Sequence, residues 1–199
     1  MTQQRKLESL EVRRDYAKLP NETVLSNGRQ LTLRLMGPAD RDNLLSFARS
    51  LPPDDLLFLR TDITEPVIVD QWIADLERGN SITVLAQARA ELAGYATMHL
   101  DQARWTRRVG EIRVQVAPRF RGNGLGRRLT LEILRLGQSH GIKKMAAMMT
   151  PDQTGARAAF EKLGFQVEAL LQDWVVDRRG RPRDLLIMSY DLEGLGNQA

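Results

Sequence analysis

The sequence contains no cysteine, which excludes disulfide bonds, thiolate metal sites and a cysteine nucleophile. Its two histidines, His99 and His140, are too few for a histidine-rich metal site, so we expect no bound metal. No apolar run approaches the roughly 20 residues that a membrane-spanning helix requires. Residues 1–16 carry charges throughout, unlike a secretory signal. We therefore expect a cytoplasmic protein with no membrane partner.

The composition is that of a folded domain. The chain has 199 residues, of which 42% are hydrophobic and 27% are charged with both signs mixed. This length suits one domain of ordinary size with a short appendage. The net charge of +4 reflects an excess of basic residues, which favours an anionic partner such as nucleic acid, an acidic protein or a polyphosphate. Charge alone does not choose among these partners.

Hydrophobic periodicity and turn residues predict alternating strands and helices. Asn27-Gly28 lies between two short apolar segments and predicts a β-hairpin with a type I′ turn. Helices are predicted at 38–51, 64–78, 125–140 and 152–163, and strands at 23–25, 30–35, 81–88, 92–100, 109–117, 144–150, 165–176 and 184–191. This order indicates one α/β domain with a mixed sheet. We assign residues 1–22 to an N-terminal helical extension, 23–193 to the domain and 194–199 to a tail.

The most informative segment joins a strand to a helix through glycines. It reads Val114-Gln-Val-Ala-Pro-Arg-Phe-Arg121-Gly-Asn-Gly-Leu-Gly126-Arg-Arg. Glycines let the backbone approach a ligand closely. The first N–H groups of the following helix lack intrahelical partners and lie at the positive end of its dipole. The segment therefore predicts an anion site suited to a pyrophosphate.

Three other interpretations of these glycines exist. They can simply form a tight turn. A Rossmann site needs Gly-x-Gly-x-x-Gly and an acidic residue after the next strand, and the spacing here is Gly-x-Gly-x-Gly. A P-loop ends in Gly-Lys-Ser/Thr, whereas this segment continues Gly126-Arg-Arg. The spacing argues against both nucleotide motifs and leaves the tight turn as the alternative.

The segment resembles the signature of the GNAT family of N-acetyltransferases. Arg121-x-x-Gly124-x-Gly126 matches that signature, and it follows a strand ending in Val-x-Val-Ala-Pro. Further along, Ala156-x-x-x-Phe160-Glu-Lys-Leu-Gly-Phe165 resembles the family's second cofactor-proximal helix. The resemblance extends from about residue 30 to 192 and is greatest to the GNAT domain of bacterial protein lysine acetyltransferases. It implies a mixed, splayed, mostly antiparallel central sheet flanked by helices.

The resemblance also implies a function. The chain is expected to transfer an acetyl group from acetyl-CoA, its co-substrate, to a primary amine on a protein lysine or a small molecule, by direct attack on the thioester. A homodimer is a further expected assembly. By position, the residues expected to bind the cofactor are Val114, Val116, Arg121, Gly122, Asn123, Gly124, Leu125, Gly126, Arg127, Gln153 and Phe160.

Amine acylation requires a base that takes a proton from the ammonium group. Glu111 is the candidate, because Glu-x-x-x-x-Val-Ala resembles the protein acetyltransferase group, in which the matching glutamate is the base. A working base would need burial to raise its pKa toward neutrality. The alternative is a strand carboxylate that pairs with Arg113 or Arg34 for structural reasons.

One position departs from the family pattern. Many members have a tyrosine on the last helix that protonates the departing CoA thiolate, and this chain has Phe160 there. A thiolate with a pKa near 8.5 is a tolerable leaving group, so activity does not require that tyrosine. The departure supports an alternative function, a catalytically weak or inactive acyl-CoA-binding regulatory module. Nucleic acid is not an expected partner, because the chain lacks a helix-turn-helix or an aromatic RNA-binding motif.

Overall fold

The computed structural model describes residues 18–193, apart from residues 58, 60, 102 and 178. The helical extension expected at residues 1–22 therefore lies largely outside the described residues, and the tail 194–199 lies wholly outside them. The first strand begins at Asn21, two residues before the predicted start of the domain. No helix in the described part of the chain combines the length and the apolar character needed to cross a membrane.

In the described part of the chain, an eight-stranded sheet forms the centre of the domain. The strands lie in the order β1-β2-β3-β4-β5-β6-β8-β7, and every described pair is antiparallel except β5 with β6. The mixed, mostly antiparallel sheet is therefore confirmed. Its strands are β1 (Asn21–Val24), β2 (Gln30–Leu35), β3 (Ser81–Ala88), β4 (Glu91–Leu100), β5 (Val109–Val116), β6 (Lys144–Met149), β7 (Gln166–Val176) and β8 (Pro182–Asp191).

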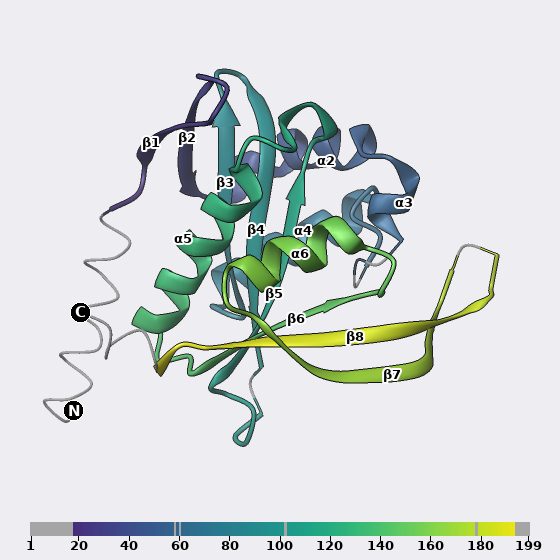
Figure 1. Cartoon of the computed structure of the whole chain (residues 1–199). Helices are drawn as coiled ribbons and strands as arrows, with labels where there is room; N and C mark the ends of the chain where they lie inside the picture. Colours follow the sequence, from purple (N-terminus) through teal and green to yellow (C-terminus); the bar gives the residue numbers. More distant parts are fainter. Residues whose placement is uncertain (1–17, 58, 60, 102, 178, 194–199) are drawn as a thin grey trace, which may run out of the picture.

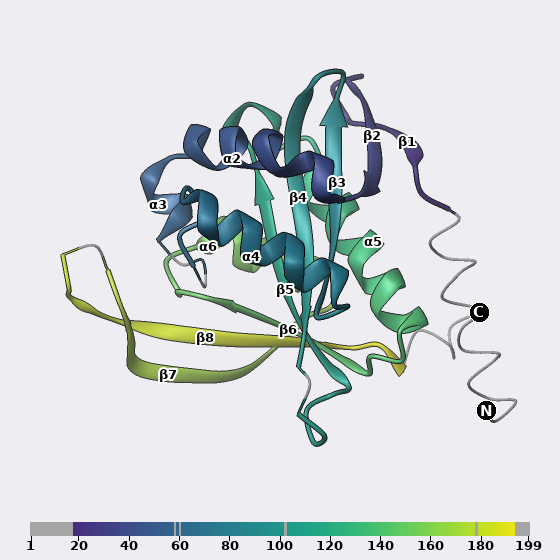
Figure 2. The same ribbon diagram turned by 180° about the vertical axis from the view of Figure 1, so that it is seen from behind.

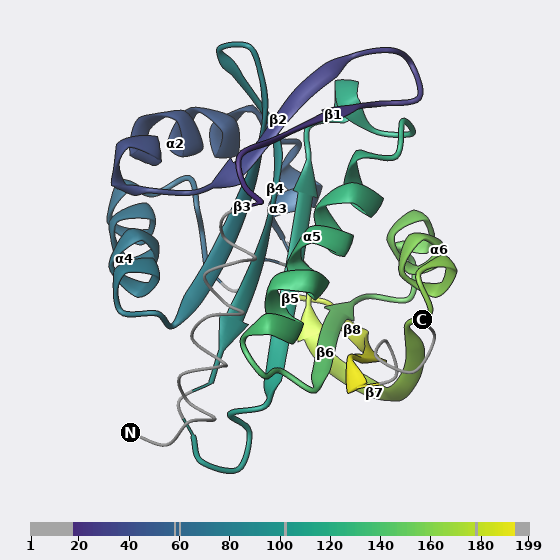
Figure 3. The same ribbon diagram turned by 90° about the vertical axis from the view of Figure 1, so that its left-hand side faces the viewer.

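Helices cover both faces of the sheet, as Figure 3 shows from the side. In Figure 1, α5 (Leu125–Ser139) and α6 (Thr154–Lys162) lie in front of the strands. In the reverse view of Figure 2, α2 (Arg41–Ser50) and α4 (Pro66–Glu77) cover the opposite face. Three short helical segments complete the fold: η1 (Pro38–Asp40), α3 (Pro53–Leu56) and η2 (Pro118–Phe120). The sequence did not predict α3.

The predicted hairpin forms between β1 and β2, but the predicted turn type is wrong. A type I′ turn requires positive φ at both central residues. In the described structure Gly28 has φ +79°, whereas Asn27 is not among the residues with positive φ. The Gly28 N–H donates to the Leu25 carbonyl at 2.9 Å, and the Leu25 N–H donates to the Arg29 carbonyl at the same distance. The loop between β1 and β2 is therefore longer than a type I′ turn, and only Gly28 in it has to be left-handed.

The helix that follows the glycine loop is held by its apolar face. Leu125, Leu129, Ile133 and Leu136 recur at helical spacing, and each is at most 1% exposed. This face packs on β3, β4 and β5. Burial of that row, at about 1.5–3 kcal/mol for each large aliphatic side chain, fixes where the N-terminus of α5 lies relative to β5.

The sheet splays between β5 and β6, as expected. The parallel pairing runs from Val109 with Lys144 to Ile112 with Ala147 and then stops. Both strands continue beyond that point, β5 to Val116 and β6 to Met149. In Figure 1 the two strands diverge from their paired ends. The wide end of the splay lies on the side of the glycine loop, because β5 runs into that loop.

Candidate functional site

The glycine loop joins η2 to α5 in a left-handed conformation at two positions. Gly122 has φ +74° and Gly124 has φ +84°, a region that residues with a Cβ enter at a cost. A Cβ placed on either glycine would meet no atom within 4 Å in the described structure. Backbone geometry, not crowding, therefore requires glycine here. The face of the loop is open to a ligand.

The N-terminus of α5 provides the anion-binding groups that the sequence predicted. The first described bond of this turn is donated by the Arg128 N–H to the Gly124 carbonyl at 3.1 Å. The N–H groups of Leu125, Gly126 and Arg127 precede it and belong to the turn that lacks intrahelical acceptors. The Arg127 and Arg128 side chains are exposed beside this turn. The free amides and the helix dipole thus favour an anion at this turn, and two exposed cations lie on the same turn.

Arg121, expected to bind the cofactor, is held against the rest of the domain. Its Nε donates to the Val116 carbonyl at 2.9 Å, and its guanidinium forms an ion pair with Asp55 of α3. Gln115 Nε2 donates to the Asp55 carbonyl at 3.0 Å. The signature arginine therefore ties the loop to β5 and α3. The sequence could not reveal Asp55 as its partner, because 66 residues separate the two.

The β1–β2 hairpin supports the other side of the loop. The Ser26 N–H donates to the Asn123 carbonyl at 3.4 Å, while Asn123 Nδ2 donates to the Arg121 carbonyl at 2.8 Å. Arg29 Nη1 donates to the Arg119 carbonyl at 3.3 Å. Arg29 also stacks on the Phe120 ring, with its guanidinium carbon 5.1 Å from the ring centre. Asn123 thus shapes the loop in two ways: its side chain bonds within the loop, and its carbonyl connects the loop to the β1–β2 hairpin.

Backbone groups of β5 are directed into the splay. The Ala117 N–H donates to the Ala93 carbonyl of β4 at 2.9 Å. Backbone groups of successive residues in a strand point to opposite sides, so Gln115 and Arg113 also turn theirs toward β4. Val114 and Val116 then direct theirs toward the gap beside β6. Arg121 already occupies the Val116 carbonyl, and the described pairing of β5 with β6 stops before Val114, so the Val116 N–H and the groups of Val114 face the gap without a paired strand.

Glu111 and Arg113 lie on the opposite face of β5 from α5, beside the narrow end of the splay. Arg113 Nη2 is 2.6 Å from Glu111 Oε1, and the two side chains are only 15% and 19% exposed. The expected alternative partner, Arg34, pairs instead with Asp40 at 2.5 Å. Glu111 is therefore a half-buried, ion-paired carboxylate. The ion pair meets the structural alternative, a carboxylate that pairs with Arg113, and the position of Glu111 places that carboxylate close to the splay.

Gln153 and Phe160 belong to the helix on the other side of the gap. The Gln153 Oε1 accepts the Thr150 N–H at 3.0 Å, so this side chain shapes the entry to α6. The Phe160 ring packs edge-on against Phe165, with centroids 4.8 Å apart. Phe165 in turn contacts Tyr190 of β8. Phe160 is thus held in an aromatic cluster.

A cavity of about 440 Å³ opens on the face covered by α4. Its floor comes from alternate residues of β4 and from Arg113, and its wall from α4 and the segment before it. The polar lining residues are Thr61, Gln71, Asp75, Asn80, Thr97, His99, Asp101 and Arg113. His99 lies opposite Glu111 in the β4–β5 register. The sequence analysis considered His99 only as a possible metal ligand and did not predict that it lines a cavity. The signal that could have shown this is the alternation of Tyr95, Thr97 and His99 along one strand, which places them on one face.

Comparison with protein families and curated proteins shows what the chain is similar to. The model of the Acetyltransferase (GNAT) family matches residues 46–165. A mycothiol acetyltransferase from Amycolatopsis mediterranei (strain U-32) is 37% identical over 86 residues, which cover 41% of this chain and 29% of that protein. The chain therefore matches less than a third of the length of this relative.

Solved structures share the fold. yncA from Salmonella typhimurium, solved with its cofactor acetyl-CoA, superposes with a TM-score of 0.72 at 21% identity and covers 81% of this chain and 94% of its own. A ribosomal-protein-alanine N-acetyltransferase from Brucella melitensis gives 0.71 at 22% identity, covering 80% and 98%. The GNAT domain of S. lividans PAT gives 0.70 at 15% identity, covering 86% and 96%.

Proposed function

Because this chain belongs to the GNAT family of acetyltransferases, we propose that it transfers the acetyl group of acetyl-CoA to a primary amine, with Glu111 as the base. Membership of the family also bears out the expected N-acetyltransferase and its co-substrate acetyl-CoA. The observation that carries the proposal is the continuity of the site. An open glycine loop at the N-terminus of α5 leads directly into a splay whose free backbone groups belong to Val114 and Val116.

Each part of the site has a separate task. The amides of Gly124–Arg127 bind the pyrophosphate, assisted by the positive end of the α5 dipole. Val114 and Val116 hydrogen-bond the pantetheine arm as an added strand would. Glu111 accepts the proton that the amine loses as its nitrogen attacks the thioester carbon. Gln153 and Phe160 shape the wall that α6 contributes.

The cavity under α4 is the proposed acceptor site. Its volume of about 440 Å³ falls within the range of sites for small ligands, about 300–1,000 Å³. Arg113 lines it and also forms an ion pair with Glu111, so one side chain connects the cavity with the proposed base. The polar lining suits a small-molecule amine with further polar groups. A protein lysine, which delivers one long side chain, is the second acceptor class.

A thiol-release assay over a panel of amines and lysine peptides tests this function. The purified chain should release CoA from acetyl-CoA only when a suitable amine is present, and mass spectrometry should find the acetyl group on that amine. Activity restricted to peptides would exclude the small-molecule proposal. Tight binding of acetyl-CoA without turnover on any acceptor would exclude the proposed enzymatic function.

The second candidate function is an acyl-CoA-binding regulatory module. Phe160 favours it, because the ring has no proton to give to a leaving thiolate. Such a module would retain the loop and the splay and would bind acetyl-CoA without turnover. The same assay, combined with calorimetric binding of acetyl-CoA, separates the two functions.

A homodimer through β7 is the assembly that we propose. This strand is at the edge of the sheet, where unpaired backbone groups can add another strand. It exposes Leu170 (52%), Trp174 (66%) and Val176 (60%). We further propose a cytoplasmic location for the protein.

A further inference from the structure

The narrow end of the splay contains a buried guanidinium. Arg113 is the first residue of β5 after its last pairing with β6, between Ile112 and Ala147. Its Nη1 crosses the gap and donates to the Met148 carbonyl at 2.7 Å. Its Nη2 lies 2.6 Å from Glu111. Its Nε is buried and has no hydrogen-bond partner within the described structure.

Arg113 lies at the point where the gap between β5 and β6 closes, so a ligand that enters this gap has to end there. An extended arm that enters from the glycine loop runs along β5 from Val116 toward the point where β5 and β6 pair. At about 3.3 Å per residue, the three steps from Val116 to Arg113 span roughly 10 Å. The reactive end of such an arm therefore meets the level of Arg113. The matching position of α6 is Phe160, whose ring carries no hydrogen-bond donor.

We propose that Arg113 is a catalytic residue that stabilises the CoA sulfur as a thiolate while the acetyl group is transferred. This proposal rests on the proposed function. The amine nitrogen forms a bond to the acetyl carbon, the carbon–sulfur bond breaks, and its electron pair goes to sulfur. The amine proton goes to Glu111. Arg113 keeps its own protons, because guanidinium does not ionise in proteins, and contributes positive charge and N–H donors. CoA leaves as the thiolate and takes a proton from water.

The charges around this position support a cationic site for sulfur. Glu111 partly neutralises Arg113 from the same strand. From β4, His99 lies opposite Glu111, and Asp101 lines the cavity beyond it. From β6, Lys144 is engaged with Glu168 of β7, and α6 presents the apolar Phe160. Arg113 is therefore a cation that reaches across the gap at its closed end.

The first test measures the thiol pKa of bound CoA and needs no acceptor. The ultraviolet absorbance of the thiolate is followed against pH for CoA bound to the protein. A cation within about 4–6 Å should lower the pKa by about one unit or more from the value measured for free CoA under the same conditions. Arg113→Met should remove that shift and Arg113→Lys should retain part of it. Arg179→Met, at the distant β7–β8 turn, is the matched control and should retain all of it.

The outcomes separate this proposal from the function on which it rests. Absence of CoA binding by the wild-type chain would overturn the proposed function. Binding with an unshifted thiol pKa would overturn the role of Arg113 alone, and wild-type protein is sufficient to show it if Arg113→Met does not fold.

The second test is a rescue. In single-turnover measurements, Arg113→Met should slow CoA release. Adding Phe160→Tyr in the same chain should restore the rate by about tenfold or more, because a hydroxyl can then supply the sulfur with a proton. If Arg113 acted only by positioning Glu111, the added tyrosine would restore nothing, and the proposal would be wrong.

Discussion

Glu111 and Arg113 form one ion pair, yet the proposed reaction assigns them opposite tasks. The carboxylate takes a proton from the amine, while the guanidinium balances negative charge on sulfur. Their side chains are only 19% and 15% exposed, so each acts where water screens little. At the scale of the residue, the proposed base and the proposed electrostatic group are held 2.6 Å apart.

Replacement of Glu111 by glutamine tests the base. Glu111→Gln should leave acetyl-CoA affinity unchanged and lower turnover by about a hundredfold or more near neutral pH. The loss should shrink at high pH, where the amine is already neutral. Steady-state rates against pH, with calorimetric binding, measure both effects. Glu168→Gln removes an exposed strand carboxylate of β7 and serves as the control; wild-type turnover in Glu111→Gln would assign Glu111 a purely structural role.

At the scale of elements, three segments hold the glycine loop: α5 through its buried face, α3 through Asp55, and the β1–β2 hairpin through Asn123. A loop held on three sides keeps its amides aligned before a ligand arrives, and such preorganisation lowers the cost of binding. Glycine at its left-handed positions is what permits that alignment.

Substitution of Gly124 tests the loop as the pyrophosphate site. Gly124→Val places a branched side chain at the open face and should weaken acetyl-CoA binding by at least about tenfold, which corresponds to about 1.4 kcal/mol. Gly180→Val is the matched control, because Gly180 also has positive φ and no atom within 4 Å of an added Cβ. It lies at the β7–β8 turn and should bind normally. Unchanged affinity in a folded Gly124→Val variant would rule out this site.

A buried ion pair connects β2 to the start of α2. Burial alone would raise the pKa of Asp40, but hydrogen bonds from Arg34 and the Gly37 N–H outweigh it and hold the pKa below its usual value. The carboxylate therefore stabilises the fold fully above the unfolded pKa of about 3.9. That contribution disappears as the pH falls through the lower folded-state pKa.

Urea unfolding at several pH values checks this connection. Asp40→Asn should lower the free energy of unfolding by about 2 kcal/mol near neutral pH, because it leaves Arg34 without its anionic partner. The variant should also lose less stability on acidification than the wild type. Asp42→Asn, whose side chain is 90% exposed in the native chain, should change neither quantity. Equal acid sensitivity in Asp40→Asn and wild type would contradict the assignment.

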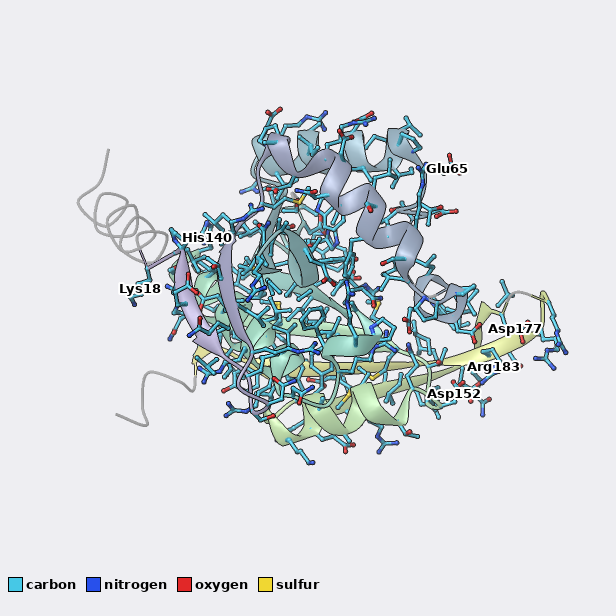
Figure 4. The ribbon with its side chains drawn as sticks, turned by 90° about the horizontal axis from the view of Figure 1, so that it is seen from above. Lys18, Glu65, His140, Asp152, Asp177 and Arg183 are labelled. Carbon is cyan, nitrogen blue, oxygen red and sulfur yellow. The ribbon has the colours of Figure 1, made fainter. Side chains whose placement is uncertain are left out.

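At the scale of the whole molecule, the β7–β8 hairpin extends beyond the helices as a long arm (Figure 1). In Figure 4, Asp177 lies toward its tip, and Arg183 lies beside Asp152 near the start of α6. The Arg183–Asp152 contact of 2.9 Å joins this arm to the segment that positions Gln153 and Phe160. An assembly formed through the arm would therefore be connected to one wall of the proposed cofactor site.

Light scattering after gel filtration tests the dimer. The wild-type chain should elute with twice its mass of 22.5 kDa, and Trp174→Glu should elute as a monomer because a charge opposes burial of the β7 surface. Trp105→Glu changes another exposed tryptophan, 89% exposed and outside β7, and should remain dimeric. A monomeric wild type would exclude the dimer.

Local patterns predicted most of this architecture because they report directly on burial and backbone conformation. The stripe of Leu125 and Leu129 specified α5, and alternation along β5 separated Val114 from Glu111. Long-range partners left no such pattern: Asp55 with Arg121, and Arg113 with the Met148 carbonyl, are set by tertiary packing. The turn at Gly28 was predicted incorrectly because Asn-Gly is compatible with more than one loop length.

The central claim is that the glycine loop and the splay form one acetyl-CoA site. A backbone amide NMR titration of the wild-type chain with CoA tests it most directly, since every amide reports its own surroundings. We predict that the amides of Gly122–Arg127, together with those of Val114 and Val116, shift most and saturate together. Shifts that gather on another surface, or loop and strand amides that saturate at different CoA concentrations, would contradict a single continuous site.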